Sequence, residues 1–275
     1  MNFNFIKNII IYVYILNCSI LLGQTNEIGV FFGGSLFHGD VGYNNAESAI
    51  LSTQPTLGLQ LKRNLNYHFG VSINIHRGTL YASDTNTSDV FKTERNLHFK
   101  SKITEFSLIS EFNLRPYMSR YSEYNISPFL FFGISSFYFN PKAQSNDGNW
   151  HALRPLGTEG QGSDYYPQRE LYDLNGIAIP FGFGYKINVY DYLTLNFNIS
   201  WRITFTDYID DVSKTYVDPN ILSELGAELS DQSDNTFPEG FQRGDPNQND
   251  KYGFIGLTIL YSIKDRQNTC ENISN

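Results

Sequence analysis

The stretch YLTLNFNISWRITF, which runs from Tyr192 to Phe205, decides the fold. Apolar side chains occupy alternate positions from Leu193 to Phe205, and polar side chains fill the positions between them. Successive side chains of a β-strand point to opposite faces of a sheet. A period of two therefore predicts a strand with one apolar and one polar face.

The same alternation recurs along the chain. It predicts eight strands, near residues 27–38, 54–63, 66–80, 99–115, 127–140, 176–187, 192–206 and 251–263. The connections alternate between short turns and four long loops, at about 39–53, 81–98, 141–175 and 207–250. An even strand number, with short turns at one rim and long loops at the other, is typical of outer-membrane barrels. We therefore expect an all-β fold, an eight-stranded up-and-down antiparallel transmembrane β-barrel.

Alternation alone does not say which face is inside, because a soluble barrel alternates too, with its apolar face inward. The small residues favour the membrane barrel. Gly70, Gly182, Gly184 and Ser200 share a face with the polar residues, and the lumen of eight strands is so narrow that small side chains belong there. The aromatic face would then point outward, where lipid makes it tolerable.

The start of the chain predicts export. Lys7 precedes an apolar run from Ile9 to Leu22, and a short run of this kind is typical of a secretory signal peptide. We expect residues 1–23 to be removed, residues 24–275 to form the barrel, and the cell outer membrane of a Gram-negative bacterium to be its location. Only Cys270 would remain, since Cys18 lies in the apolar run, so the mature chain would hold neither a disulfide nor a cysteine metal site.

Charged residues fall on the polar faces of the predicted strands. In a narrow lumen they would be costly to bury unpaired, so we expect them to pair and to close the barrel as a polar plug. A small gated pore or proton path is the alternative interpretation. The predicted lumen residues are Glu105, Glu111, Arg115, Lys186 and Arg202.

Two of the long loops carry unusual composition. HALRPLGTEGQG, from His151 to Gly162, lacks the spacing and the lysine of a phosphate-binding loop, so we interpret its glycines as turn formers in an ordered loop. Residues 207–250 contain eleven acidic and two basic side chains, against a net charge of -8 for the whole chain. We expect a solvated acidic surface there, with a Ca²⁺ site at Asp207, Asp210, Asp211 and Asp218 as the alternative, and no binding of nucleic acid.

Four separated segments carry a family resemblance: ERNLHFKSKITEFSLISEFNL from Glu94, SPFLFFGISSFYFNPKA from Ser127, LRPLGTEGQG from Leu153 and TFTDYIDDVSKTYVD from Thr204. Together they resemble the PorG family of Bacteroidota, which are outer-membrane barrel components of the type IX secretion system associated with gliding motility. The resemblance implies a structural anchor for a periplasmic ring, and it supplies no catalytic residues. A small OmpA- or OmpW-like barrel, or a minor pore without a secretion role, is the alternative.

The expected partners are outer-membrane lipid and periplasmic ring proteins, bound at the rim of short turns. The link at 116–126 is the longest of these turns, and Arg120, Tyr121 and Tyr124 in it are of types enriched at interfaces; an aromatic girdle is the competing interpretation. We expect no enzyme activity, no cofactor and no small-molecule substrate, because no catalytic or dinucleotide motif occurs. A lipid-modifying site at the rim, using His38, His98 or His151, is the remaining alternative.

Overall fold

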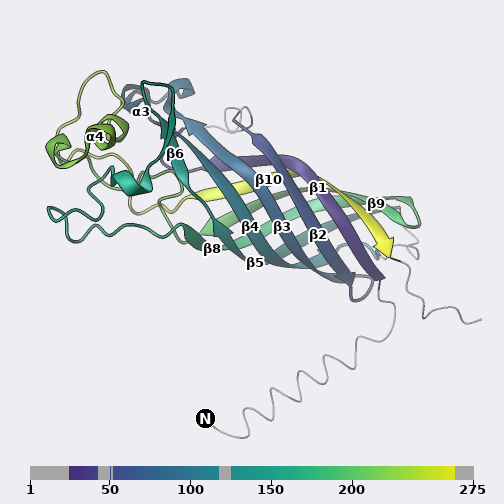
Figure 1. Cartoon of the computed structure of the whole chain (residues 1–275). Coiled ribbons are helices and arrows are strands. Elements are labelled where there is room, and N and C mark those ends of the chain that lie inside the picture. The colour runs from purple at the N-terminus through teal and green to yellow at the C-terminus, as the bar shows by residue number, and fades with distance from the viewer. Residues whose placement is uncertain (1–24, 43–49, 51, 118–124, 264–275) are drawn as a thin grey trace, which may run out of the picture.

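The computed structural model describes residues 25–42, 50, 52–117 and 125–263. Eight long antiparallel strands form a closed barrel (Figure 1). Their bounds are β1 Thr25–His38, β2 Gln54–Asn64, β3 Phe69–Ser83, β4 His98–Asn113, β5 Ile126–Tyr138, β8 Asn175–Tyr190, β9 Leu193–Thr204 and β10 Lys251–Ile263. Each strand lies within a few residues of its predicted position, and the predicted fold class is confirmed.

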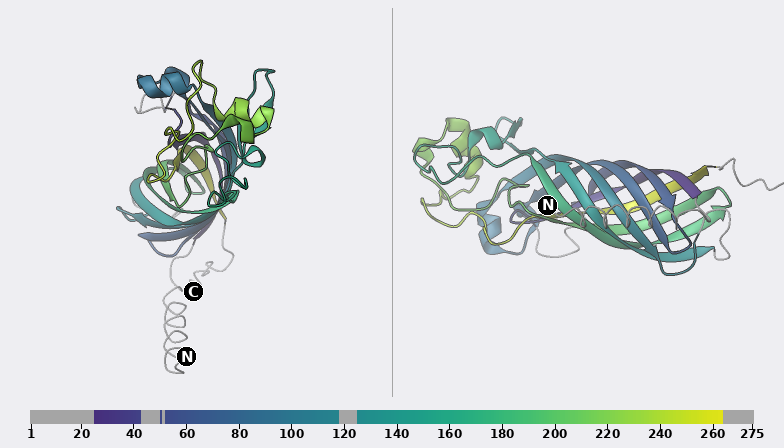
Figure 2. Two further views of the ribbon diagram at one scale, coloured as in Figure 1. Left: turned by 90° about the vertical axis from the view of Figure 1, so that its left-hand side faces the viewer. Right: turned by 90° about the horizontal axis from the view of Figure 1, so that it is seen from below.

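Closure comes from pairing of the first and last strands. Each strand is hydrogen-bonded to its neighbours along the chain, and β1 pairs with β10 from Asn26 opposite Ile263 to His38 opposite Lys251. The short connections therefore gather at one end, the turn end, together with the start of β1 and the end of β10. The long connections gather at the other, the loop end (Figure 2).

Smaller elements lie at the loop end. The strands β6 Pro141–Gln144 and β7 Trp150–Ala152 form a hairpin that extends the sheet from β4. Two short helices, α3 Val90–Arg95 and α4 Glu224–Ser230, and three single turns, η1 Asp84–Asn86, η2 Arg154–Leu156 and η3 Pro219–Ile221, lie in the loops. Among the described residues, no helix is both long enough and apolar enough to span a membrane.

The polar face of each strand points into the barrel, as the small residues predicted. In β4 every second side chain, including Glu105 and Glu111, is buried, while those between them are exposed. The outward side chains are large and apolar: Phe132 is 66% and Ile134 63% exposed. Outward aromatic and aliphatic side chains cover the strands of the barrel wall, which is the surface that a lipid bilayer requires.

The interior is more aromatic than the alternation suggested. Phe129 and Phe131 of β5 point inward, and a Cβ atom added to Gly184 or Gly182 would lie only 2.7 or 2.6 Å from their ring carbons. These inward glycines therefore make room for rings across the lumen. Towards the loop end the lumen is filled by a continuous apolar core, which includes Leu80, Phe99 and Tyr252 and extends to Ile209 and Val212 of the last loop.

Candidate functional site

The turn end of the lumen is closed by a cluster of buried charges. Glu111 accepts a hydrogen bond from Lys62 at 2.8 Å and another from Lys186. Lys62 also lies 3.6 Å from Glu27, and Lys186 donates to Asn113 Oδ1 at 2.6 Å. Two cations and two carboxylates, all four buried, thus neutralise one another, which is what makes their burial tolerable.

Tyr117 completes this closure from outside the strands. It follows β4, and its hydroxyl donates to Glu27 at 3.1 Å and lies 2.9 Å from Thr194 Oγ1. The ammonium groups of Lys62 and Lys186 lie 5.1 and 4.5 Å from the centre of its ring, a cation–π arrangement. Burial raises the pKa of the Tyr117 hydroxyl well above its usual value, so the group remains a proton donor.

A second cluster lies halfway along the barrel. Arg202 donates two hydrogen bonds to Glu105, at 2.8 and 3.0 Å, and Tyr252 donates a third at 2.7 Å. His76 Nδ1 lies 3.7 Å from the same carboxylate, and the Arg202 guanidinium lies 4.1 Å from the centre of the Phe254 ring. The bidentate pair, closed in by rings, blocks the middle of the lumen.

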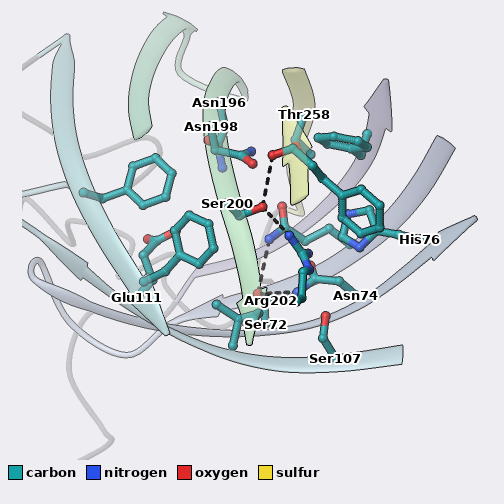
Figure 3. A pocket seen from close by; sticks show the side chains of 16 residues that line it. Ser72, Asn74, His76, Ser107, Glu111, Asn196, Asn198, Ser200, Arg202 and Thr258 are labelled. Carbon is teal, nitrogen blue, oxygen red and sulfur yellow. Dashed lines mark hydrogen bonds between the residues drawn. The ribbon is translucent and has the colours of Figure 1, made fainter. Parts of the chain in front are cut away.

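A polar cavity of about 50 Å³ separates the two clusters (Figure 3). Buried oxygens of Gln60, Ser107 and Asn196, all on strands around this lumen, have no hydrogen-bond partner within the described protein. A space of this size with unpaired polar groups is suited to a few water molecules, whereas small-molecule sites measure roughly 300–1,000 Å³.

Four of the five predicted lumen residues therefore occupy the interior in two pairs, Glu105 with Arg202 and Glu111 with Lys186. Arg115 is placed differently from the prediction. Strand β4 ends at Asn113, so the alternation that pointed Arg115 inward has already stopped, and the residue is exposed. The residues Arg120, Tyr121 and Tyr124 lie outside the described residues, as does the predicted signal peptide.

The loop end is covered by loops held together by buried arginines. Arg95 donates to Asp84 at 2.8 and 3.1 Å and to the Asp40 carbonyl at 2.8 Å. Arg243 donates to Glu159 at 3.0 Å and to the Asp211 carbonyl at 2.7 Å. Segments far apart in the sequence thus meet in one cap over the barrel mouth.

The segment from His151 to Gly162 is part of this cap, and its glycines form turns as the sequence predicted. Gly157, Gly160 and Gly162 all have positive φ, of 57°, 77° and 73°, which glycine adopts without steric cost. These turns place Glu159 inside the cap, where its carboxylate also accepts from the backbone N–H groups of Ser213 and Lys214 at 2.9 and 3.0 Å.

The acidic loop is only partly the predicted solvated surface, because four of its eleven acidic residues are buried: Asp207, Asp210, Asp211 and Asp250. Asp210 accepts from the backbone of Val41 and Val212, both at 3.0 Å, and Asp211 accepts from the Tyr172 hydroxyl at 2.6 Å. Burial raises the pKa of Asp207 to about 9, of Asp210 to about 8 and of Asp211 to about 6. The composition could not foretell this, because it does not say which carboxylates fold inward. Within the described chain, no group of three or more His, Cys, Asp or Glu residues is arranged to hold a metal ion.

The rim histidines lie apart from one another. His98 Nε2 accepts from the backbone of Gln144 at 3.0 Å, and His151 Nε2 lies 3.9 Å from Asp147. His38 is exposed at the end of β1. Among the described residues, none of the three is hydrogen-bonded to a serine or cysteine side chain.

Comparison with known protein families identifies the family of the chain. Residues 6–152, more than half of the chain, match the model of a family described as Domain of unknown function (DUF6089). The chain belongs to this family. No curated protein matches it.

Several solved structures are similar in fold. The attachment invasion locus protein Ail of Yersinia pestis is 10% identical, with a TM-score of 0.41, over 88% of this chain and all of Ail. Neisserial surface protein A is 6% identical, with a TM-score of 0.41, over 88% of this chain and 97% of its own. The outer membrane protein OprG from Pseudomonas aeruginosa is 9% identical, with a TM-score of 0.37, over 88% and 98%.

Sequence reasoning missed part of the site. Glu27 and Lys62 share the inward parity of their strands, so the alternation itself would have found them. Tyr117, Arg95 and Arg243 lie outside the barrel strands, and no periodic signal marks them.

Proposed function

We propose that this protein is a structural outer-membrane barrel of a type IX-like secretion system, and that it anchors a periplasmic ring without conducting the exported protein. The observation that carries this proposal is the closed lumen. Glu27, Lys62, Glu111 and Lys186 meet across the turn end, and the Glu105–Arg202 pair blocks the middle. A polypeptide has no room in such an interior.

The outward apolar wall supports a membrane location. The outward apolar side chains would be unfavourable in water, since exposed apolar patches of this extent mark membrane or protein contacts. An exported chain inserted in the outer membrane would place its turn end in the periplasm, because long loops of such barrels face outward from the cell. A ring anchor would then use the turn end, and the resemblance to PorG gives the class of partner.

The turn containing Arg120, Tyr121 and Tyr124 is the proposed contact. At the turn end of the barrel, the exposed rings of Tyr190 and Tyr192 stack with their centres 5.7 Å apart. Exposed aromatic rings at the rim are typical of an aromatic girdle. The test must therefore separate a girdle from a protein contact.

Replacement of Arg120, Tyr121 and Tyr124 by alanine in cells distinguishes an aromatic girdle from a protein contact. We expect the triple variant to assemble, to migrate heat-modifiably on a gel and to fractionate with the outer membrane, but to lose the periplasmic partner in a pull-down. The matched control replaces the exposed tyrosines Tyr190 and Tyr192, and it should retain the partner on whatever barrel assembles. Full partner recovery and secretion in the triple variant would reject this turn as the anchor, and recovery of the wild type in the soluble periplasm would reject the membrane barrel itself.

The second candidate function is a small barrel or minor pore without a secretion role. The polar cavity between the two charge clusters favours it, since water in that cavity would form part of a pore if both clusters opened. Large, stable conductance steps from the wild-type protein in planar bilayers would promote this candidate over the anchor.

A further inference from the structure

Charge is divided sharply between the two faces of the strands. Within the described residues, every carboxylate on a strand points into the barrel, namely Glu27, Glu105 and Glu111. The charged side chains on the outward face of the strands are all cations, and four of these six lysines and arginines lie together. They are Arg77 on β3, Lys100 and Lys102 on β4, and Lys142 on β6. We call these four residues the basic wall patch.

The strand register makes the patch continuous. Lys100 lies directly opposite Lys142, and Lys102 lies two positions along the same face of β4. Arg77 lies opposite Thr104, one diagonal step from Lys102. Diagonal neighbours on one face of a sheet are roughly 7–8 Å apart, so each of the four side chains has another cation of the patch beside it, and the patch can bind an anionic group that spans neighbouring strands. Figure 1 shows the three strands side by side at the loop end of the wall.

The patch is not neutralised by the protein. Among the described residues, none of the four forms an ion pair. Two acidic side chains of the neighbouring loops are engaged elsewhere: Asp147 binds Ser145 and Asn149, and Glu228 accepts from the backbone of Asn146. Like charges placed directly opposite on a sheet are unfavourable. An anion that binds both Lys100 and Lys142 would therefore stabilise this part of the sheet.

The surroundings point to a lipid rather than a soluble anion. Immediately towards the turn end, the outward wall becomes apolar, with Ile75 opposite Phe106. At the boundary, Thr104 lies opposite the exposed Tyr138, and the Lys100 ammonium lies 5.5 Å from the centre of the Trp150 ring. Tyrosine and tryptophan mark the interface between headgroups and hydrocarbon. The basic wall patch thus lies at the height of lipid headgroups, directly above a surface for acyl chains.

We infer that the basic wall patch binds the phosphorylated headgroup of a lipid in the leaflet at the loop end, while the acyl chains of that lipid cover the wall around Ile75 and Phe106. This inference rests on the proposed membrane location, but it does not depend on a secretion role. The bound anion stabilises the wall beneath the cap by offsetting repulsion between the cations.

The experiment uses the full barrel in phosphatidylcholine nanodiscs doped with phosphorylated lipid A, with retained lipid counted by native mass spectrometry. The variant replaces Arg77, Lys100, Lys102 and Lys142 by glutamine. Each cation near a charged membrane surface contributes about a fivefold change in affinity, so we expect retention to fall on the order of several-hundred-fold. Lys251→Gln, which removes an isolated outward cation at the same end, is the matched control and should lose at most about fivefold.

Three results would overturn the inference: unchanged retention in the quadruple variant, equal retention of lipid A whose phosphates have been removed, or displacement of lipid A by inorganic polyphosphate at equal affinity. The last result would show that the patch takes soluble polyanions. Heat-modifiable migration of the quadruple variant confirms that it is folded. If the wild-type chain itself fails to enter the nanodisc, the proposed membrane location is refuted as well, which distinguishes the two failures.

Discussion

The pair at the middle of the lumen offers a quantitative test of how the barrel is closed. Arg202→Met removes both hydrogen bonds that the guanidinium donates to Glu105, at 2.8 and 3.0 Å. The carboxylate would keep the Tyr252 hydroxyl at 2.7 Å, but it would stay buried without a directly bonded cation. Removing one partner of a buried pair typically costs about 3–5 kcal/mol, and the full exclusion of Glu105 from solvent places this site within that range.

Removing both charges should cost much less. In the double variant Glu105→Gln/Arg202→Met no lone charge is left, and the amide can still accept from Tyr252. Replacement of a buried ion pair by neutral groups is often close to neutral, so we expect the double variant to lose no more than about 1–2 kcal/mol. The difference between the single and double variants measures the burial of an unpaired carboxylate.

Urea unfolding in phospholipid vesicles provides the assay, with Trp201 on the outward face of β9 reporting its transfer from lipid to water. With a slope of about 2 kcal/mol per molar urea, the single variant should shift the midpoint down by roughly 2 M and the double variant by less than about 1 M. A loss below about 1 kcal/mol in Arg202→Met, or an equal loss in both variants, would refute the view that the buried Glu105 carboxylate depends on the Arg202 cation for its stability.

The remaining predictions concern the two ends of the barrel. Tyr117→Ala should raise the otherwise low conductance in planar bilayers by opening the turn end, whereas Tyr190→Ala, which removes an exposed ring at the same end, should not; equal conductance in both would contradict the closure. Burial raises the pKa of Asp207 to about 9, so the folded cap retains a proton that the unfolded loop releases, and its stability should fall as the pH rises from about 4 to about 9. Asp207→Asn should flatten this decline in thermal melts followed by near-ultraviolet circular dichroism, and an unchanged slope would contradict the assignment. Gly157→Ala should loosen the cap and speed its proteolysis, since φ is 57° and the added Cβ would lie 2.6 Å from a backbone oxygen, whereas Gly240→Ala, at φ 81° with open space around it, should be milder.

Prediction from the sequence succeeded where a simple period applies. Each strand alternates over many residues, and the tight turns at residues 65–68 and 191–192 fix which strands are neighbours, so strand number, order and facing were accessible. The pairing of Glu105 with Arg202 was accessible only as an expectation that lumen charges neutralise one another. Which carboxylate binds which cation depends on the stagger of the strands, because Glu105 and Arg202 are 97 residues apart in the chain.

The sequence by itself determined a barrel with an apolar exterior and a polar interior, because alternate residues of a strand point to its two opposite faces. Only the tertiary structure decided how that barrel is closed. Arg115 follows the same parity as Glu111 but leaves the lumen, because β4 ends two residues earlier. Tyr117 enters the lumen, and Arg95 and Arg243 join loops from opposite parts of the chain. These positions follow from where the chain leaves the sheet and from which buried charges need partners, and neither is encoded in a local period.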